Sequence, residues 1–457
     1  MKTVNKKEKD NSKILESKRI IKEEKKKIKL EKKLIRKRKK EHYKKTKFGK
    51  TKIGKILGKI FFVFSDKNNY SFSEVFIVTI VSILLGIFAC LSVLTIIGGG
   101  RNYFKLINDF NKLYDVYDVL IDNYYGDIDK NKLVESAING MVSSVGDVYT
   151  SYNNVSTTDS FNQIVNGTYE GIGCSIRQSE KEITIFEVYD DTPASKAGLK
   201  KGDIVKTVDD MDALKLGVNK LSNYIKSEAK GKIKMVIIRD DNEITLTLER
   251  GKVEIPSISS EIFEENNKKI GYIDISIFSS VSGKQFKTSL DNLEEKGIDA
   301  LVIDVRDNSG GYLSTVTDIA SYLLPKGEII YKVQNGDKTT TTKDKTVEKR
   351  KYPIAIITNS NSASASEILA AAIKESYHGF VVGTKTYGKG TVQQVKQLSD
   401  GSMIKYTVEN WLTPLGNWIN EKGIEPTDEV KLSDEYLKDP KKENDNQLNK
   451  ALELVSK

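Results

Sequence analysis

The chain has 457 residues, of which 73 are Lys or Arg and 63 are Asp or Glu, so its net charge is +10. The surplus is confined to one end: residues 1–70 carry 27 basic and 8 acidic side chains, a net of +19, and the remainder carries −9. A content of 38% hydrophobic and 8% aromatic residues excludes disorder of the whole chain. At roughly 150 residues per domain, the length predicts two or three domains.

Residues 1–74 form the basic tail. Within it, residues 8–50 are rich in Lys and Glu, and they predict a solvated helix because polar residues fill the second apolar position that a coiled coil needs. Residues 53–64 are basic and apolar, a pattern typical of a segment on an anionic membrane surface. Polyanion binding through the tail is one hypothesis for function, but no nucleic-acid motif supports it and the acidic remainder gives no reason to expect nucleic acid.

Residues 75–97 contain neither a charged residue nor a proline. A helix of this length spans roughly 30 Å of hydrocarbon, which predicts a transmembrane helix. A buried core helix is the alternative, but such helices normally have a polar stripe, and a cleaved signal peptide has a shorter apolar core. The basic residues are concentrated before this helix in the sequence. The positive-inside rule therefore places residues 1–74 in the cytoplasm and the residues after the helix outside the cell membrane.

Cysteine and histidine are scarce beyond residue 97. Cys174 and His378 are the only ones there, so the sequence predicts neither an intrachain disulfide nor a Cys-rich metal site in this part. We therefore expect no metal and no organic cofactor.

The remaining chain divides by pattern into four segments. Residues 98–167 predict helices over 102–125 and 132–145, and residues 168–252 predict five or six short strands with one or two helices. Residues 253–432 alternate strands with helices, and unbroken apolar strands such as 354–357 are typical of an α/β layered domain. Residues 433–457 form a polar tail whose amphipathic stretch, 448–455, we interpret as a lid or a dimer contact in a possible homo-oligomer.

A Gly-x-Gly turn begins the β-rich segment. Gly171, Ile172, Gly173 and Cys174 lead into a strand, and backbone N–H groups exposed by such a turn suit a peptide carboxylate. About 20 residues later the chain reads DDTPASKAGLKKGDIV, residues 190–205. Together the two motifs resemble a PDZ domain, which implies that residues 171–174 bind the end of a peptide.

Ser364 stands at the predicted start of a helix, within NSNSASASEILAAA, residues 359–372. With Glu367 three residues later it forms a capping-box pattern, so a capping role is one reading. Free N–H groups at a helix start can also stabilise an oxyanion, which makes a nucleophile the other.

A serine nucleophile needs a base. His378 lies in a polar turn without a clear carboxylate partner, so a Ser-His-Asp triad is disfavoured and lysine is the candidate. Burial can lower the pKa of a lysine enough for this task. Lys389, between Gly388 and Gly390, fits better than Lys385, although a solvated surface charge is the other reading of either lysine.

The order of these motifs resembles the carboxyl-terminal processing peptidases, which are serine peptidases with a Ser-Lys dyad. The resemblance covers residues 103–428 and rests on the PDZ-like motifs, LVIDVRDNSGG (301–311), SASASE (362–367), GKGTVQ (388–393) and TPLGNWINEKGIEP (413–426). It implies that Ser364 is the nucleophile, that Lys389 is the general base and that Gln393 orients Lys389. It also implies that the amides of Gly310, Gly311 and Ala365 form the oxyanion hole.

Two positions depart from the family pattern. Ser309 replaces a proline that is common before the glycine pair, and Cys174 replaces an aromatic residue in the peptide-binding loop. Neither changes the dyad, so the resemblance implies a membrane-anchored endopeptidase that binds substrate ends through its PDZ domain. A catalytically silent PDZ adaptor is the alternative, but it would not require Ser364, Lys389 and Gln393 together.

Overall fold

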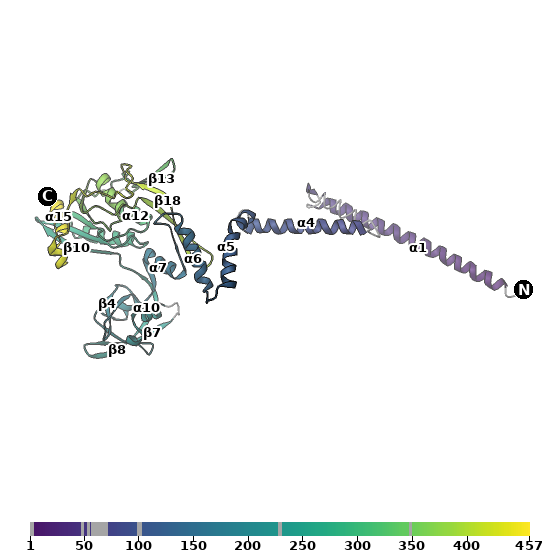
Figure 1. Cartoon of the computed structure of the whole chain (residues 1–457), viewed down its shortest axis with the longest axis horizontal. Helices are drawn as coiled ribbons and strands as arrows, with labels where there is room; N and C mark the ends of the chain where they lie inside the picture. The colour runs from purple at the N-terminus through teal and green to yellow at the C-terminus, as the bar shows by residue number, and fades with distance from the viewer. Residues whose placement is uncertain are drawn as a thin grey trace. The chain divides into compact units, whose positions relative to one another are not determined.

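The computed structural model describes residues 4–46, 50–52, 55, 72–97, 103–226, 231–346 and 350–457. The chain divides into two compact units, Met1–Asp127 and Ile128–Lys457. The elements are drawn in Figure 1.

The first unit is helical. It contains α1 (Val4–Lys45), α4 (Phe72–Ile97) and α5 (Tyr103–Asn123). The described side chains of α1 are exposed or half-buried, as expected for a charged helix that has no continuous apolar face to pack against another helix. The predicted membrane-surface segment, residues 53–64, lies outside the described residues except for Lys55.

Helix α4 covers the segment that the sequence predicts to span a membrane. Within the part of the chain that the structure describes, no helix is both long enough and apolar enough to cross a bilayer. The transmembrane prediction is therefore not confirmed by the structure.

The second unit begins with α6 (Lys130–Ser143), β1 (Ser151–Asn153) and α7 (Val155–Asn166). An antiparallel sheet follows in the order β3-β4-β5-β7-β8, with β6 on the edge of β5. The alternation of side chains along the strand explains its core: in β7, Ile233, Met235 and Ile237 are buried, whereas Lys232 and Lys234 on the other face are exposed. The bounds are β3 (Cys174–Gln178), β4 (Ile183–Val188), β5 (Ile204–Val208), β6 (Met211–Asp212), β7 (Lys232–Arg239) and β8 (Asn242–Glu249).

Three short helices complete this β-rich module: α8 (Pro193–Lys196), α9 (Ala213–Leu216) and α10 (Val218–Lys226). A separate antiparallel pair, β2 (Thr168–Gly171) with β9 (Gly251–Glu254), carries the chain into and out of the module. The sequence predicts five or six strands with one or two helices here; among the described residues the sheet has six strands, as predicted, but the module has three short helices.

A six-stranded sheet forms the centre of the second unit, in the order β10-β11-β12-β15-β16-β19. Only the β10–β11 pair is antiparallel. The bounds are β10 (Ile258–Glu265), β11 (Lys268–Ile275), β12 (Ala300–Asp304), β15 (Ile354–Thr358), β16 (Phe380–Gly383) and β19 (Asp428–Glu429).

Both faces of this sheet are buried. One face packs in the same core as α11 (Ser282–Glu295), α12 (Leu313–Leu323) and α13 (Ala365–Ala372). The other face packs against α15 (Asn446–Ser456), through Leu448, Ala451 and Val455. Burial on both sides explains why β12 and β15 are apolar at every interior position.

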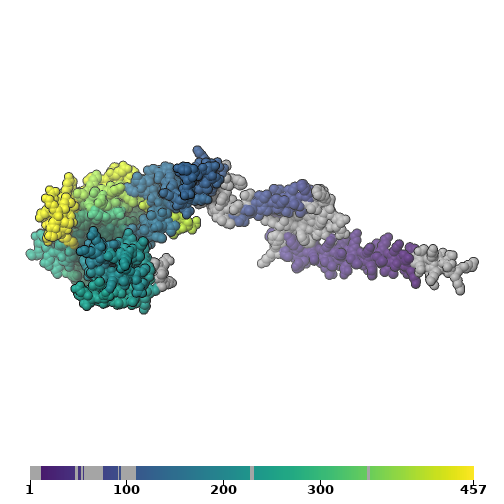
Figure 2. All heavy atoms as spheres, turned by 60° about the horizontal axis from the view of Figure 1, so that its bottom comes forward, coloured from purple at the N-terminus to yellow at the C-terminus, as the bar shows by residue number. Residues whose placement is uncertain are grey.

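The position of α15 corrects one expectation. We interpreted residues 448–455 as a lid or a dimer contact, but their apolar side chains belong to the core of their own chain. The C-terminal residues, yellow in Figure 2, form an outer layer of the molecule. Two short helices, α14 (Asp434–Lys438) and η2 (Lys442–Asn444), lead into α15.

A second, smaller sheet flanks the site described below. Its order is β1-β18-β13-β14, and β17 also pairs with β18. Strand β17 begins directly after the GKG motif. Strand β1 joins the sheet at the opposite edge of β18, and two residues just before β1, Asp147 and Tyr149, lie near Lys389. The bounds are β13 (Ile329–Asn335), β14 (Lys338–Lys343), β17 (Thr391–Gln397) and β18 (Met403–Leu412).

Candidate active site

Ser364 occupies the N-cap of α13 in a conformation that is rare for a residue with a side chain. Its φ is 57° and its ψ is −111°, in the region where L-residues are strained. The predicted capping box with Glu367 is present. The next residue, Ala365, is the first of the helix, so its amide has no intrahelical acceptor.

Glu367 connects the serine to the lysine loop. Its side chain is fully buried, and Oε2 accepts the amides of Ser364 at 2.8 Å and Lys389 at 2.9 Å. Its Oε1 accepts the amide of Gly388 at 2.7 Å and the hydroxyl of Thr386 at 2.6 Å. Sequence reasoning identified Glu367 only as a helix cap, because its other partners lie 19 to 22 residues away.

The GKG loop is also fixed by Trp411 of β18 and by the later TPLGNWINEKGIEP motif, which contains Trp418 and Asn420. Trp411 donates to the carbonyl of Lys389 at 2.7 Å, and Trp418 donates to the carbonyl of Gly390 at 3.0 Å. A Cβ at Gly390 would lie 2.7 Å from the amide nitrogen of Asn420, so only glycine fits there. The motif therefore shapes the loop that presents Lys389.

Lys389 is half-buried, and its charge state reflects its surroundings. Burial, followed by the nearby Lys405, lowers the pKa of Lys389 below the usual value, while Glu367 and Asp147 oppose the shift. The ammonium lies 4.9 Å from the ring centroid of Tyr149. Burial and the neighbouring Tyr387 raise the pKa of Tyr149 to about 12, so its hydroxyl is neutral.

Asp147 and Tyr149 come from the segment before β1, and sequence reasoning missed both. Burial alone would raise the pKa of Asp147, but hydrogen bonds from Thr150, Thr407 and the amide of Tyr149 hold it below its usual range. Asp147 is therefore charged near Lys389. Nothing in residues 147–149 marks them as part of a site, because only the pairing of β1 with β18 brings them there.

The alternative bases are placed differently. Lys385 is exposed and forms an ion pair with Glu425 at 2.7 Å. His378 is exposed and adopts a left-handed conformation at the end of the π-helical turn η1 (Ile373–Tyr377). Of these three, Lys389 alone combines partial burial with a lowered pKa and a hydrogen-bonded link to the backbone of Ser364.

The glycine pair lies against the serine. A Cβ at Gly310 would come within 2.8 Å of the Ser364 Cβ and 3.1 Å of the Ala365 nitrogen. The Gly310 amide donates to the side chain of Asn308 at 2.8 Å, so it differs from the expectation that both glycine amides face a substrate. Among the described residues, no hydrogen bond engages the Gly311 amide.

Gln393 is not bonded to Lys389 in this structure. Its amide group donates to the hydroxyls of Thr391 at 2.9 Å and Thr407 at 3.2 Å. Thr407 in turn hydrogen-bonds to Asp147. The orientation of Lys389 by Gln393 therefore stays a prediction.

The predicted peptide-binding loop lies at the junction of β2 and β3. Gly173 has a φ of 86°, and a Cβ there would lie 2.2 Å from Thr192, so this turn requires glycine. Ile172 is buried in the module's core, and burial raises the pKa of the half-buried Cys174 to about 12, which keeps the thiol neutral. The PASKAGLKKGD motif holds this loop in place, because the amide of Ala194 donates a hydrogen bond to the carbonyl of Ile172.

Because we expect Lys389 to act as the general base, replacing Lys405 with glutamine is expected to shift the pH dependence of peptide hydrolysis. Removing this positive charge raises the pKa of Lys389, so the acidic limb of the kcat profile should move to higher pH while the alkaline plateau is unchanged. Peptide hydrolysis measured from pH 6 to 10 checks this. The matched control, Lys396→Gln on the exposed face of β17, should leave the profile in place, and identical profiles for all three proteins would contradict the role of Lys405.

The chain is similar to known peptidases. Residues 269–430 match peptidase family S41, residues 171–249 match the PDZ domain, and residues 97–157 match the activating protease CtpB N-terminal domain. Carboxy-terminal processing protease CtpB of Bacillus subtilis (strain 168) is 36% identical over 334 residues, which cover 72% of this chain and 69% of that protein. CtpA of the same organism is 34% identical over 334 residues, covering 72% and 71%.

A solved structure, that of the photosystem II D1 C-terminal processing protease, matches with a TM-score of 0.43 and 24% identity over 78% of this chain and 92% of its own. The sequence similarities define a serine-type peptidase with a PDZ domain and a mixed α/β core. More narrowly, the chain belongs to the carboxy-terminal processing proteases of peptidase family S41.

Proposed function

We propose that this peptidase is a membrane-anchored endopeptidase in which Ser364 is the nucleophile and Lys389 the general base. The observation that carries the proposal is the double contact of Glu367, whose Oε2 holds the backbones of both residues. A fixed relation between nucleophile and base is what general-base catalysis requires.

Neutral Lys389 would take the hydroxyl proton of Ser364 as the oxygen attacks the scissile carbonyl. Its lowered pKa supports this step, because a larger fraction of the amine is neutral near physiological pH. The protonated amine would then give its proton to the leaving amine. Water activated by the same lysine would release the acyl group from Ser364.

The amides of Gly311 and Ala365 would bind the oxyanion of the tetrahedral intermediate. Ala365 is supported by its place at the first position of α13, where the helix dipole also favours negative charge. Gly311 is supported by the close approach of its loop to Ser364. Loss of one such donor costs about 3 kcal/mol of transition-state stabilisation.

The PDZ domain would bind the C-terminal or exposed hydrophobic end of a substrate protein. The N–H groups of residues 172–174 would receive the carboxylate, and an extended peptide would pair with β3. The β2–β9 pair carries both connections of this domain, so the segment 251–256 is where we place the hinge.

Membrane anchoring is the part of the proposal that rests on the sequence. The 23 uncharged residues 75–97 lie within helix α4, and side chains such as Phe76, Leu84 and Phe88 are exposed on it. An exposed apolar helix after a +19 segment suits an anchor with its N-terminus in the cytoplasm. Residue 98 onward would then lie outside the cell.

Cleavage of an unstructured protein tests the function. The full chain, solubilised in mild detergent, should cleave casein, and Ser364→Ala should not. Ser360→Ala, an exposed serine on the same loop, is the matched control and should cleave as the parent does. Equal cleavage by parent and Ser364→Ala would refute the nucleophile. Peptide binding by the parent without any cleavage would favour a silent PDZ adaptor.

A further inference from the structure

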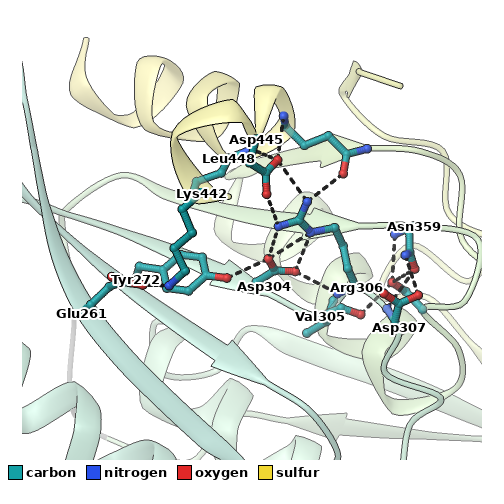
Figure 3. Close-up of polar contacts among 12 residues, drawn as sticks. Glu261, Tyr272, Asp304, Val305, Arg306, Asp307, Asn359, Lys442, Asp445 and Leu448 are labelled. Atoms are coloured by element: carbon teal, nitrogen blue, oxygen red, sulfur yellow. Dashed lines mark hydrogen bonds and ion pairs between the residues drawn. The ribbon is translucent and has the colours of Figure 1, made fainter. Parts of the chain in front are cut away.

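Arg306 is a cation, 13% exposed, between the central sheet and the C-terminal helix. Its Nη2 lies 2.6 Å from Asp304, the last residue of β12, and 2.7 Å from Asp445, the N-cap of α15 (Figure 3). Its Nη1 also contacts Asp445 at 3.2 Å and Gln447 at 3.0 Å. Arg306 thereby joins two segments that lie about 140 residues apart in the sequence.

The surroundings make this contact costly to break. Asp304 is 3% exposed and Asp445 is 2% exposed, and Arg306 is the cation that both carboxylates contact directly, while Lys442 also lies near enough to Asp445 to interact with its charge. The Tyr272 hydroxyl donates to Asp304 at 2.9 Å, and Lys442 lies over the Tyr272 ring while pairing with Glu261. Burial, and then Asp304, raises the pKa of nearby Asp274 to about 6.

The loop that begins at Arg306 ends at the glycine pair. Asp307, directly after Arg306, accepts the side-chain amides of Asn359 and Asn361 at 2.9 and 2.8 Å, from the loop that leads to Ser364. Asn308 accepts the amide of Ala363 on its carbonyl and holds the amide of Gly310 with its side chain. Asp307 and Asn308 thus hold the loop that carries Gly310 and Gly311 against the segment before Ser364.

We propose that Arg306 is a positioning residue for the oxyanion hole and that Asp445 and Gln447 are its anchor, which makes the C-terminal segment part of the catalytic apparatus. The inference rests on the proposed function, because it requires Gly311 and Ala365 to bind the oxyanion. Loss of the anchor leaves Arg306 held by Asp304 alone, through Nε and Nη2, and the start of the loop shifts. The Gly311 amide then leaves its place in the transition state, while peptide binding at the PDZ loop is unaffected.

Asp445→Asn in the full chain tests the inference. Asparagine caps a helix as well as aspartate does, so the oxygen that accepts the amides of Gln447 and Leu448 is kept. The negative charge that pairs with Arg306 is lost. We expect kcat to fall about 10-fold, part of the loss that follows complete removal of an oxyanion donor, with KM within twofold of the parent. Affinity for a peptide aldehyde, which forms an oxyanion on Ser364, should fall by the same factor.

Glu453→Gln, which removes an exposed charge from the same helix, is the matched control and should leave kcat unchanged. All assays are run below the unfolding temperature of each variant. An Asp445→Asn protein with a lowered Tm but the parental kcat and aldehyde affinity would overturn the inference, as would an equal loss in the Glu453→Gln control.

A second variant covers failure of Asp445→Asn to fold. Gln447→Leu removes one neutral acceptor from Arg306, and we expect a smaller loss of kcat, again without a change in KM. Parental kcat in this variant would count against the anchor. Ser364→Ala separates the two proposals: if it remains active, the proposed function fails, whereas its inactivity beside fully active anchor variants overturns only the role of Arg306.

Discussion

Replacing Lys389 with methionine is expected to lower kcat for peptide hydrolysis by about 1000-fold, within the range for loss of a general base. Methionine keeps much of the length and apolar volume of lysine, so the loop held by Trp411 and Glu367 should persist. What disappears is the amine that we propose receives the Ser364 proton. KM should change little, because the amine acts in the transition state and not in substrate binding.

The pH profile makes this prediction specific. In the parent, kcat should rise with pH through the lowered pKa of Lys389 and then reach a plateau, since only the neutral amine is a base. The residual kcat of Lys389→Met should no longer rise with pH over this range. Lys385→Met, which removes an exposed lysine four residues away, is the matched control and should retain both rate and profile. Full activity in Lys389→Met together with loss in Lys385→Met would move the base to Lys385.

Local motifs were enough to predict the main elements of the catalytic core. The unbroken apolar strand 354–357 indicated burial on both faces, and the structure covers its sheet with helices on each side. Ser364 and Lys389 were each identified as candidates from a short motif of neighbouring residues. Such signals are local, so they survive without knowledge of the fold.

The other parts of the site depend on contacts between distant segments. Tyr149 reaches Lys389 only because β1 pairs with β18, and Asp445 reaches Arg306 only because α15 crosses the sheet. The sequence pattern of residues 448–455 indicates an apolar helix face but not what covers it. The same holds for Glu367. Its capping role could be predicted from its spacing of three residues from Ser364, whereas its contacts to the lysine loop could not be predicted from the sequence.

Replacing Glu367 with glutamine should affect both catalysis and stability. The carboxylate accepts four hydrogen bonds in a fully buried position, two on each oxygen. Glutamine keeps the shape of the side chain but replaces one carboxylate oxygen with an NH₂ group. This NH₂ group is a hydrogen-bond donor, so it cannot accept the two hydrogen bonds that the oxygen accepted. At about 1.5 kcal/mol or more for each hydrogen bond to a charged group, we expect a loss of about 3 kcal/mol in the free energy of unfolding.

The expected effect on kcat is a fall of about 100-fold, the size that follows from an ångström-scale misplacement of reacting groups. The chain offers a direct readout of the cause, because its two tryptophans, Trp411 and Trp418, both donate to the lysine loop. Their fluorescence should change in the folded Glu367→Gln protein before any urea is added, and the urea midpoint should fall.

Glu295→Gln, on the exposed end of α11, is the matched control and should leave fluorescence, midpoint and kcat as in the parent. The combination of results is decisive. A lowered urea midpoint with parental kcat and parental fluorescence would mean that Glu367 stabilises the fold without positioning the dyad. Loss of kcat with a changed tryptophan signal would instead place the Ser364–Lys389 relation under the control of this one buried carboxylate, since no other described side chain accepts the amides of both residues.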